Sequence, residues 1–404
     1  QSIRDSLALD HPQPHRIVAH IKTEVSPLRP KKARLIQAFD RYADNYIVAD
    51  HYRAFTHAFV LWTAQPRYFM GMHTHVRSAC GLNRVDIAQQ ISDWLLIYPP
   101  GPNTKIFIDD VSNMDGSVQM PHLMRQAELY QHLSPALHEH FSATTAFKGV
   151  VRESQMDRAN GPVRYIGLAT VKSGAQDTSS GQTCRRLDGI VVCFQRLGAK
   201  AIVGFVFGDD VWLLVVGPPS LPDIVLEQQK YGWKTKGVYV DTLEQSEFLS
   251  CGFAYTSDGL VHMFPLLGKL FAKLFWTWRT VSPRRAASYR HQVAEGILPA
   301  FSGFRFVVGW LSWHLSKRRF NKHTRWIPDA RAKLPATAPP GCVCWADYVQ
   351  NRYGLLMPEP IDWTDFSHSQ SHLVYNPWVN MVMGFDLADP AERGTDTFLG
   401  PLLL

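Results

Sequence analysis

The sequence predicts an α+β fold, and three observations lead to this expectation. Residues 201–217 hold two short apolar runs on either side of a Gly-Asp-Asp triplet, which is the pattern of a β-hairpin. Helix-period segments at 86–98 and 178–198 alternate with short strand-like runs. Beyond residue 261 the pattern is mostly helical. We therefore expect a sheet with helices, followed by a helical C-terminal part.

Local patterns give the elements in chain order. Residues 1 to about 65 mix basic and apolar residues with several prolines. Then come a helix at 86–98, a short strand ending in acids at 104–110, a helix at 120–141, a hairpin around Asn160-Gly161, a helix at 178–198, the hairpin at 201–217, a helix at 222–232, short strands to about 261, and mostly helix beyond.

Length and charge narrow the class of protein. The chain has 404 residues, of which 46% are hydrophobic and 19% charged, enough for a large core in two or three domains. A formal net charge of +7 favours an anionic partner, either nucleic acid or an acidic membrane surface. Six irregularly spaced cysteines do not make a disulfide framework and suggest a reducing compartment.

Two apolar stretches, 260–278 and 301–315, come nearest to membrane segments. Neither holds the roughly 18 uninterrupted apolar residues that a spanning helix needs. Both look amphipathic, which leaves two interpretations open: buried helices of a domain, or peripheral attachment to a membrane surface. The chain begins with Gln1 and no signal-peptide pattern follows, so we interpret it as a fragment or a processed product.

The predicted hairpin at 201–217 carries two adjacent carboxylates. We expect Asp209 and Asp210 to lie in its turn, where their like charges repel and a divalent cation would relieve the repulsion. An ordinary exposed acidic turn is the alternative. A second acidic set strengthens the first interpretation, because Asp110 ends an apolar strand and Asp115 follows five residues later. Oxygen ligands from two strand ends suit two Mg²⁺ ions about 3.5–4 Å apart, the arrangement that transfers phosphoryl groups.

A Ser/Gly-rich segment, 172–182, lies between the two acidic sets. Its Ser173 and Gly174 are small enough for the backbone to approach a ligand closely. Thr178 and Gln182 lie four residues apart, on one face of the predicted helix, where a hydroxyl and an amide could bind a sugar hydroxyl. The alternative is a Ser/Gly-rich turn with an ordinary helix cap.

The order of these motifs resembles that of viral RNA-dependent RNA polymerases of positive-strand RNA viruses, within them the tombusvirus-like and nodavirus-like group. DVSNMDGSV is similar to motif A of that family, SGAQDTSSGQ to motif B, FGDD to motif C, YGWKTKG to motif D and SEFLSCGF to motif E. IKTEVSPLRPKKARLIQAF, residues 21–39, resembles the basic motif F. Each motif alone is weak, but six in order across residues 20–260 form a specific pattern.

The resemblance implies a right-hand polymerase of fingers, palm and thumb, with an antiparallel-sheet palm and a largely helical thumb. It implies partial fingers with motif F at 1–75, a palm with motifs A to E at 76–260, a fingers insertion at about 140–170, and a thumb with a C-terminal tail at 261–404. The family has a longer segment before motif F, so we expect part of the fingers to be missing.

The resemblance also implies roles for single residues. Asp110 and Asp209, with Asp210 beside them, would hold two Mg²⁺ ions, for which Mn²⁺ could substitute. Lys236 would protonate the leaving pyrophosphate, with Lys234 as the fallback. Nucleotide binding would fall to Asp115, supported by Thr178 and Gln182, to Ser173 and Gly174 under the templating base, and to Lys22, Lys31, Lys32 and Arg34 on the triphosphate. Residues 248–251 would grip the primer strand.

The residue types agree with these roles on physical grounds. Asp115 is small enough to leave room for the ribose 2′-OH and can accept its hydrogen bond. A reverse transcriptase would be expected to carry a bulky aromatic there, so DNA synthesis is not expected. The chain departs from the family at Gln182, where the family has Asn; glutamine carries the same amide on a longer side chain.

Three functions are weighed. The main hypothesis is template-directed RNA synthesis that replicates a viral genome, with an RNA template, a product strand and nucleoside triphosphates as partners. The second is a non-catalytic RNA-binding or replication-complex assembly fragment, and the third is a two-metal nuclease. From the family we also expect peripheral membrane association, other viral replication proteins as partners, and a location at membrane-associated replication complexes in the host cytoplasm.

Other features admit two interpretations each. Cys342 and Cys344 with His368 and His372 could ligate zinc, although the Cys spacing is tighter than usual and a plain structural role is the alternative. The basic stretch 315–325 is either a solvated face or a thumb contact with RNA. Four tryptophans are expected to pack between helices: Trp276, Trp278, Trp310 and Trp313. Arg185 and Arg186 are expected to be ion-paired surface residues or contacts to the RNA backbone.

Overall fold

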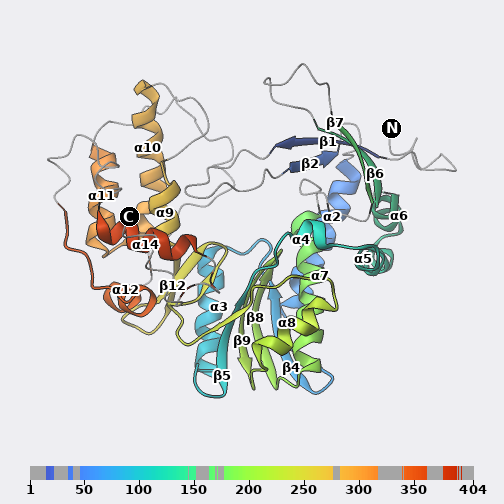
Figure 1. The fold of residues 1–404 in the computed structure, drawn as a ribbon, viewed down its shortest axis with the longest axis horizontal. Coiled ribbons are helices and arrows are strands. Elements are labelled where there is room, and N and C mark those ends of the chain that lie inside the picture. The colour runs from blue at the N-terminus through green and yellow to red at the C-terminus, as the bar shows by residue number, and fades with distance from the viewer. Residues whose placement is uncertain are drawn as a thin grey trace. The chain divides into compact units, whose positions relative to one another are not determined.

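The computed structural model describes residues 15–21, 35–39, 46–143, 145–151, 163–168, 171, 177–275, 283–316, 339, 341–361, 376–388, 390 and 393. It contains both helices and sheets, as the sequence predicts (Figure 1). The chain divides into two compact units, which are described separately: unit 1 is Gln1–Glu24, Arg29–Cys80 and Asp109–Gly237, and unit 2 is Val25–Leu28, Gly81–Ile108 and Val238–Leu404. These units do not test the predicted fingers, palm and thumb boundaries, which stay a prediction.

Unit 1 contains a four-stranded sheet in the order β2-β1-β6-β7. Its strands are β1 (His15–Ile21), β2 (Leu35–Phe39), β6 (Ala146–Val151) and β7 (Val163–Leu168). β1 pairs antiparallel with β2 and parallel with β6, and β6 pairs antiparallel with β7. The β6–β7 pair agrees with the hairpin predicted around Asn160-Gly161, although residues 152–162 between the strands lie outside the described residues.

A second group of strands in unit 1 runs in the order β9-β8-β4-β3. The strands are β3 (Arg67–Phe69), β4 (Met72–Ser78), β8 (Ala201–Phe207) and β9 (Asp210–Val216). β8 pairs antiparallel with β9, which confirms the hairpin predicted at 201–217, and parallel with β4. Two helices pack on these strands: α7 (Thr178–Arg196) against β8 and β4, and α2 (Tyr46–Thr63) against β4. α8 (Leu221–Gln229) packs against α7.

The helix predicted at 120–141 is wrong in one respect, because the structure has two helices there. α5 (Met120–Leu133) ends at Ser134, and α6 (Pro135–Ala143) begins with a proline. Pro135 has no N–H to continue the hydrogen bonding of α5, but it is well suited to the first position of a new helix. The Ser134 side chain accepts a hydrogen bond from the Leu137 N–H at 3.4 Å and so caps that helix.

Unit 2 combines small sheets with a helical part. α3 (Arg84–Ile97) packs against β13, β5 (Thr104–Asp109) pairs with β10 (Val238–Val240), and a three-stranded antiparallel sheet runs β11-β12-β13. The members of that sheet are β11 (Glu247–Phe248), β12 (Cys251–Tyr255) and β13 (Val261–Pro265). The helices that follow are α9 (Leu267–Lys273), α10 (Pro283–Ile297), the 3₁₀ helix η1 (Leu298–Phe301), α11 (Arg305–Ser316), α12 (Trp345–Tyr353) and α14 (Pro377–Leu387).

The two apolar stretches considered for membrane attachment are core segments of unit 2. The first is not one helix, since residues 261–265 form strand β13 before α9 begins. Phe271 of α9 and Trp310 of α11 are buried in one apolar cluster, with ring centroids 5.5 Å apart. Trp310 and Trp313 therefore pack between helices as predicted, whereas Trp276 and Trp278 lie outside the described residues. Among the described helices, none combines the length and hydropathy needed to span a membrane.

Candidate active site

The Gly-Asp-Asp triplet lies at the tip of the β8–β9 hairpin. The ladder closes with Phe207 opposite Asp210, so the turn itself consists of Gly208 and Asp209. Gly208 has a φ of 62°, and glycine at the first position of a two-residue turn is the type II′ pattern that suits the twist of a hairpin. The prediction that both acids lie in the turn is corrected here, because Asp210 is already the first residue of β9. Both carboxylates are half-buried.

Helix α7 contacts this turn through the side chain of Thr183. The Gly208 N–H donates to the Thr183 hydroxyl oxygen at 2.8 Å, and that hydroxyl donates in turn to the Ser179 carbonyl at 2.6 Å. Thr183 is completely buried. The role of Thr183 could not be predicted from the sequence, because a threonine inside a helical pattern gives no sign of a hydrogen bond to a turn 25 residues away.

Gln182 lies between the Gly-Asp-Asp turn and the second acidic segment. Its amide Nε2 donates to a carboxylate oxygen of Asp115. A Cβ added to Gly208 would lie 3.5 Å from Gln182 Oε1, so the other end of the same amide faces the turn. Asp115 belongs to the short helix α4 (Met114–Ser117). The structure thus brings together three predicted elements: the acid at 115, the amide at 182 and the turn beside Asp209.

The segment that carries Asp110 lies beside the predicted motif D. The Lys236 N–H donates to the Asp110 carbonyl at 3.1 Å, and the Ser112 N–H donates to the Lys234 carbonyl at 3.0 Å. Lys236 is half-buried and Lys234 is exposed. The backbone of the proposed proton donor is therefore fixed against the residue proposed to bind metal.

Asp109, one residue before Asp110, was not singled out from the sequence and is the centre of a buried polar network. Its carboxylate forms an ion pair with Arg186 of α7, and both side chains are fully shielded from solvent. It also accepts from Gln228 Nε2 at 3.2 Å, from the Thr235 hydroxyl, and from the Lys236 N–H at 3.1 Å. One carboxylate therefore joins the end of β5 to helices α7 and α8 and to the segment of Lys236.

Of the two alternatives for Arg185 and Arg186, the surface alternative is wrong, since both are buried. Arg186 is ion-paired, as expected, but with Asp109 inside the protein. Burial lowers the pKa of Arg185, and the negative charge of Asp177 opposes that shift. Asp177 is itself buried at the start of α7, where it accepts hydrogen bonds from Gln126 at 3.0 Å and from the Tyr130 hydroxyl at 3.1 Å.

The donor chemistry of the acidic residues fits magnesium. Carboxylates at Asp110, Asp209 and Asp210 are the hard oxygen ligands that Mg²⁺ and Mn²⁺ prefer. Within the described part of the chain, no group of three or more His, Cys, Asp or Glu side chains is placed to hold a metal ion. Cys342 is exposed and Cys344 is half-buried.

Several predicted site residues lie outside the described part of the chain. They are Ser173 and Gly174 of motif B, Lys22, Lys31, Lys32 and Arg34 of motif F, His368 and His372 of the zinc hypothesis, and residues 317–325 of the basic stretch. Motif F is described only at its ends, where Ile21 of β1 pairs with Leu35 of β2. Thr178, the other predicted member of motif B, is the first residue of α7 and is half-buried.

Comparison with known proteins gives a structural likeness without a sequence match. No protein-family model matches the chain, and no curated protein matches it. Among solved structures, it is similar to the RNA-dependent RNA polymerase of a human picobirnavirus, in an insertion-loop deletion mutant, with a TM-score of 0.54. The fold is of the viral RNA-dependent RNA polymerase kind.

The structural match has low sequence identity and covers part of each chain. The identity is 14%, and the match covers 70% of this chain and 54% of the picobirnavirus chain. The chain thus spans about half the length of that polymerase. The likeness supports the predicted polymerase fold. It has no bearing on the tombusvirus-like and nodavirus-like group, which stays a prediction from the motifs.

Proposed function

We propose that this chain is the catalytic part of a viral RNA-dependent RNA polymerase, which copies an RNA template by ribonucleotidyl transfer. One observation carries the proposal: the amide of Gln182 bonds to Asp115 on one side and faces the Gly208 turn on the other. Three segments far apart in the sequence therefore meet at the residues that the motif pattern assigns to nucleotide selection and metal binding. The fold likeness to a viral polymerase supports the same conclusion.

In this proposal Asp110 and Asp209, with Asp210 adjacent, bind two Mg²⁺ ions, or Mn²⁺ in their place. When bound, such ions lower the pKa of the attacking 3′-OH and neutralise the charge that develops on the pyrophosphate. The protein's own contribution is position. The turn that bears Asp209 is held by Thr183, and the backbone that follows Asp110 is paired with the segment of Lys236.

Asp115 and Gln182 select the sugar. The carboxylate of Asp115 accepts a hydrogen bond from the ribose 2′-OH, the group by which proteins distinguish RNA from DNA. Gln182 donates to one oxygen of that carboxylate and so fixes its orientation. Gln182 carries the same amide as the asparagine of the resembled family, on a longer side chain.

Lys236 is the proposed general acid that protonates the departing pyrophosphate. A lysine can fill this role only where its ammonium group reaches the leaving oxygen, so a fixed backbone matters. The Lys236 N–H is anchored twice, on the Asp109 carboxylate and on the Asp110 carbonyl, both at 3.1 Å. Lys234 is exposed two residues away and serves as the comparison residue.

The partners follow from the same proposal. They are an RNA template, the product strand and nucleoside triphosphates, with Lys22, Lys31, Lys32 and Arg34 on the triphosphate and Ser173 and Gly174 below the templating base. The net charge of +7 suits a polyanionic partner. The finer parts of the proposal are membership of the tombusvirus-like and nodavirus-like group, other viral replication proteins as partners, and replication complexes on cytoplasmic membranes as the location.

Primer extension tests the proposal. The assay uses an RNA primer–template, Mg²⁺ and labelled ribonucleotides, and compares the parent chain with Asp209→Ala and with Asp93→Asn. Asp93 is exposed on α3, where it accepts a hydrogen bond from Gln89 at 3.0 Å, so Asp93→Asn is the control for the loss of a surface carboxylate. We expect template-dependent product from the parent and Asp93→Asn, and none from folded Asp209→Ala.

The other possible results would contradict either the metal assignment or the proposed function. Retained synthesis by a folded Asp209→Ala variant would refute the metal assignment. RNA binding without nucleotide incorporation by the parent would favour the non-catalytic RNA-binding fragment, and degradation of the template would favour the two-metal nuclease.

A further inference from the structure

The hairpin that joins β11 to β12 has an unfavourable turn. Phe248 pairs with Cys251, which leaves Leu249 and Ser250 as the two turn residues. Their φ angles are 53° and 59°, in the left-handed region where a branched, non-glycine side chain costs free energy. Two-residue turns with positive φ at both positions are normally built from Asn-Gly. A conformation of this kind persists only where the surroundings determine it.

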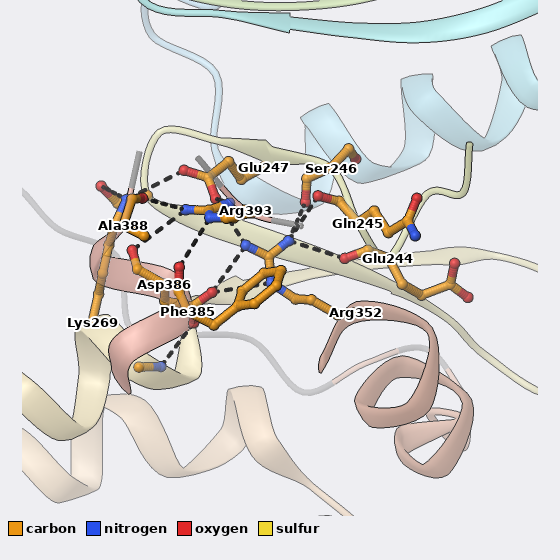
Figure 2. Close-up of polar contacts among 12 residues, drawn as sticks. Glu244, Gln245, Ser246, Glu247, Lys269, Arg352, Phe385, Asp386, Ala388 and Arg393 are labelled. Carbon is orange, nitrogen blue, oxygen red and sulfur yellow. Dashed lines mark hydrogen bonds and ion pairs between the residues drawn. The ribbon is translucent and has the colours of Figure 1, made fainter. Parts of the chain in front are cut away.

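One buried arginine, Arg352 of α12, holds the residues that lead into this turn (Figure 2). Its Nη1 donates to three consecutive carbonyls, those of Glu244, Gln245 and Ser246, at 3.0–3.1 Å. Its Nη2 donates to the Glu247 carboxylate at 2.8 Å. A single planar guanidinium thus fixes the four residues that lead into the hairpin. Lysine could not replace it, because its ammonium group has fewer N–H donors and no planar arrangement of them.

Arg352 is itself held by the C-terminal helix α14. Its Nε and Nη2 donate to one oxygen of Asp386 at 3.1 and 3.0 Å, and all of these side-chain atoms are buried. The other Asp386 oxygen accepts from the Gly268 N–H of α9 at 2.8 Å. Arg393 reaches the same Glu247 carboxylate with one nitrogen and the Phe385 carbonyl with another, as Figure 2 shows. One network therefore joins residues 244–247, Arg352, Asp386 and Arg393.

The network stays charged across the neutral range. Burial opposes ionisation of Glu247, but Arg393, Arg352 and Lys269 outweigh it and lower its pKa to about 2. Burial also opposes the charge on Arg352, yet Asp386 and its neighbours raise its pKa well above the ordinary value. Cations outnumber anions among the side chains that these ion pairs join. The most exposed of them is Lys269, whose Nζ lies 3.4 Å from Glu247 and 3.5 Å from the exposed Ser250 hydroxyl.

We propose that Arg352 is a positioning residue for the growing RNA strand: anchored by Asp386, it holds the Leu249–Ser250 turn so that the Ser250 hydroxyl and the Lys269 ammonium meet a backbone phosphate. This inference rests on the proposed function and adds that the C-terminal segment, through Asp386 and Arg393, is part of the strand-binding apparatus. The chemistry recognised is a phosphodiester, by one cation and one hydroxyl.

Binding of labelled RNA tests the inference without need of catalysis. The probes are a primer–template duplex with a recessed 3′ end and the same template single-stranded. We expect Arg352→Lys to weaken binding of the duplex about tenfold, the size of one lost charge-assisted hydrogen bond, and to leave the single strand unaffected. Lys269→Gln should lower the salt slope of duplex binding by about one, as for the loss of one phosphate contact.

A rescue variant separates positioning from mere stability. Leu249→Asn places a residue that tolerates left-handed backbone in the turn, so it should restore duplex binding to Arg352→Lys while recovering only a small part of the lost unfolding temperature. Val382→Ala, in the buried apolar cluster on the same helix α14, is the destabilised control and should bind duplex like the parent. Loss of duplex binding by Val382→Ala equal to that of Arg352→Lys, or failure of the rescue, would overturn the inference.

The two proposals fail in different ways. A parent chain that binds the duplex but adds no nucleotide refutes the proposed function, while the binding comparison still decides the role of Arg352. A parent chain that adds nucleotides, with an Arg352→Lys variant that binds duplex equally well, overturns the role of Arg352 alone.

Discussion

Removing the guanidinium of Arg186 should cost a large part of the stability of unit 1. In Arg186→Met, Asp109 keeps its hydrogen bonds to Gln228 and Thr235, but its charge is left buried without a cation. Both side chains are fully shielded from solvent, so water cannot replace the lost partner. Breaking a buried pair from one side costs about 3–5 kcal/mol. A typical domain has only about 5–15 kcal/mol in total.

A double-mutant cycle measures the pair itself. Asp109→Asn also strands one charge and should cost a similar amount, whereas the combination with Arg186→Met removes both charges and should recover most of the loss. Urea unfolding of the four proteins gives the coupling free energy, which we expect to exceed about 2 kcal/mol. The exposed pair Lys105–Asp241 is the matched control, and its cycle should give about 0–1 kcal/mol.

Activity should not follow stability in this cycle. The double variant regains folding, but residue 109 is then a neutral amide, whose one oxygen accepts more weakly from Thr235 and from the Lys236 N–H than a carboxylate does. Single-nucleotide addition should therefore stay slow although the protein is folded. A coupling free energy near zero, or a double variant with parental addition rate, would refute the reasoning that this ion pair holds the segment of Lys236.

Three further predictions concern single residues. Gln182→Leu should weaken discrimination against deoxyribonucleotides, because Asp115 loses the donor that orients it; competition between ribo- and deoxyribonucleotides in primer extension measures this, and an unchanged preference would contradict it. Gly204→Ala should destabilise the hairpin by several kcal/mol in urea unfolding, since the glycine has φ of 154° and an added Cβ would lie 2.1 Å from the Trp212 carbonyl; a loss below about 1 kcal/mol would be too small. Burial and a nearby arginine lower the pKa of His314 from 6.5 to about 4, so the unfolded state binds a proton more readily and stability should fall as the pH drops from about 6.5 to 4; His314→Gln should flatten that slope.

Strong local patterns gave the elements that matter most for the site. The two short apolar runs at 201–217 and the period-3.6 pattern at 178–198 correspond to β8, β9 and α7 within two residues. Helix α2, by contrast, was not predicted, although Tyr52, Phe55 and Phe59 recur at helical spacing and are all buried. The break at Ser134-Pro135 was also readable, because proline interrupts a helix and suits the start of the next. Both features were therefore present in the sequence as local patterns, although neither was predicted from it.

The role of Asp109 could not be predicted from the sequence for a different reason. Asp109 is the last residue of β5 and Asp110 follows it directly, and successive residues of an extended chain point to opposite faces, so the two carboxylates were expected to differ in environment. Nothing local says which one faces the interior. That choice depends on Arg186 and Gln228, 77 and 119 residues away, whose positions follow only from the packing of α7 and α8.

Helix α7 explains how Asp109 and Asp115 are placed at once. Gln182 and Arg186 lie four residues apart, which puts them on the same face of the helix. Gln182 bonds to Asp115 and Arg186 to Asp109, so one rigid face fixes both sides of Asp110. The same helix holds the Gly208 turn through Thr183. Because Thr178 and Gln182 were already assigned to this face from their spacing, the next member of the row was Arg186. The sequence therefore contained the full row, and only the burial of its last member required the structure.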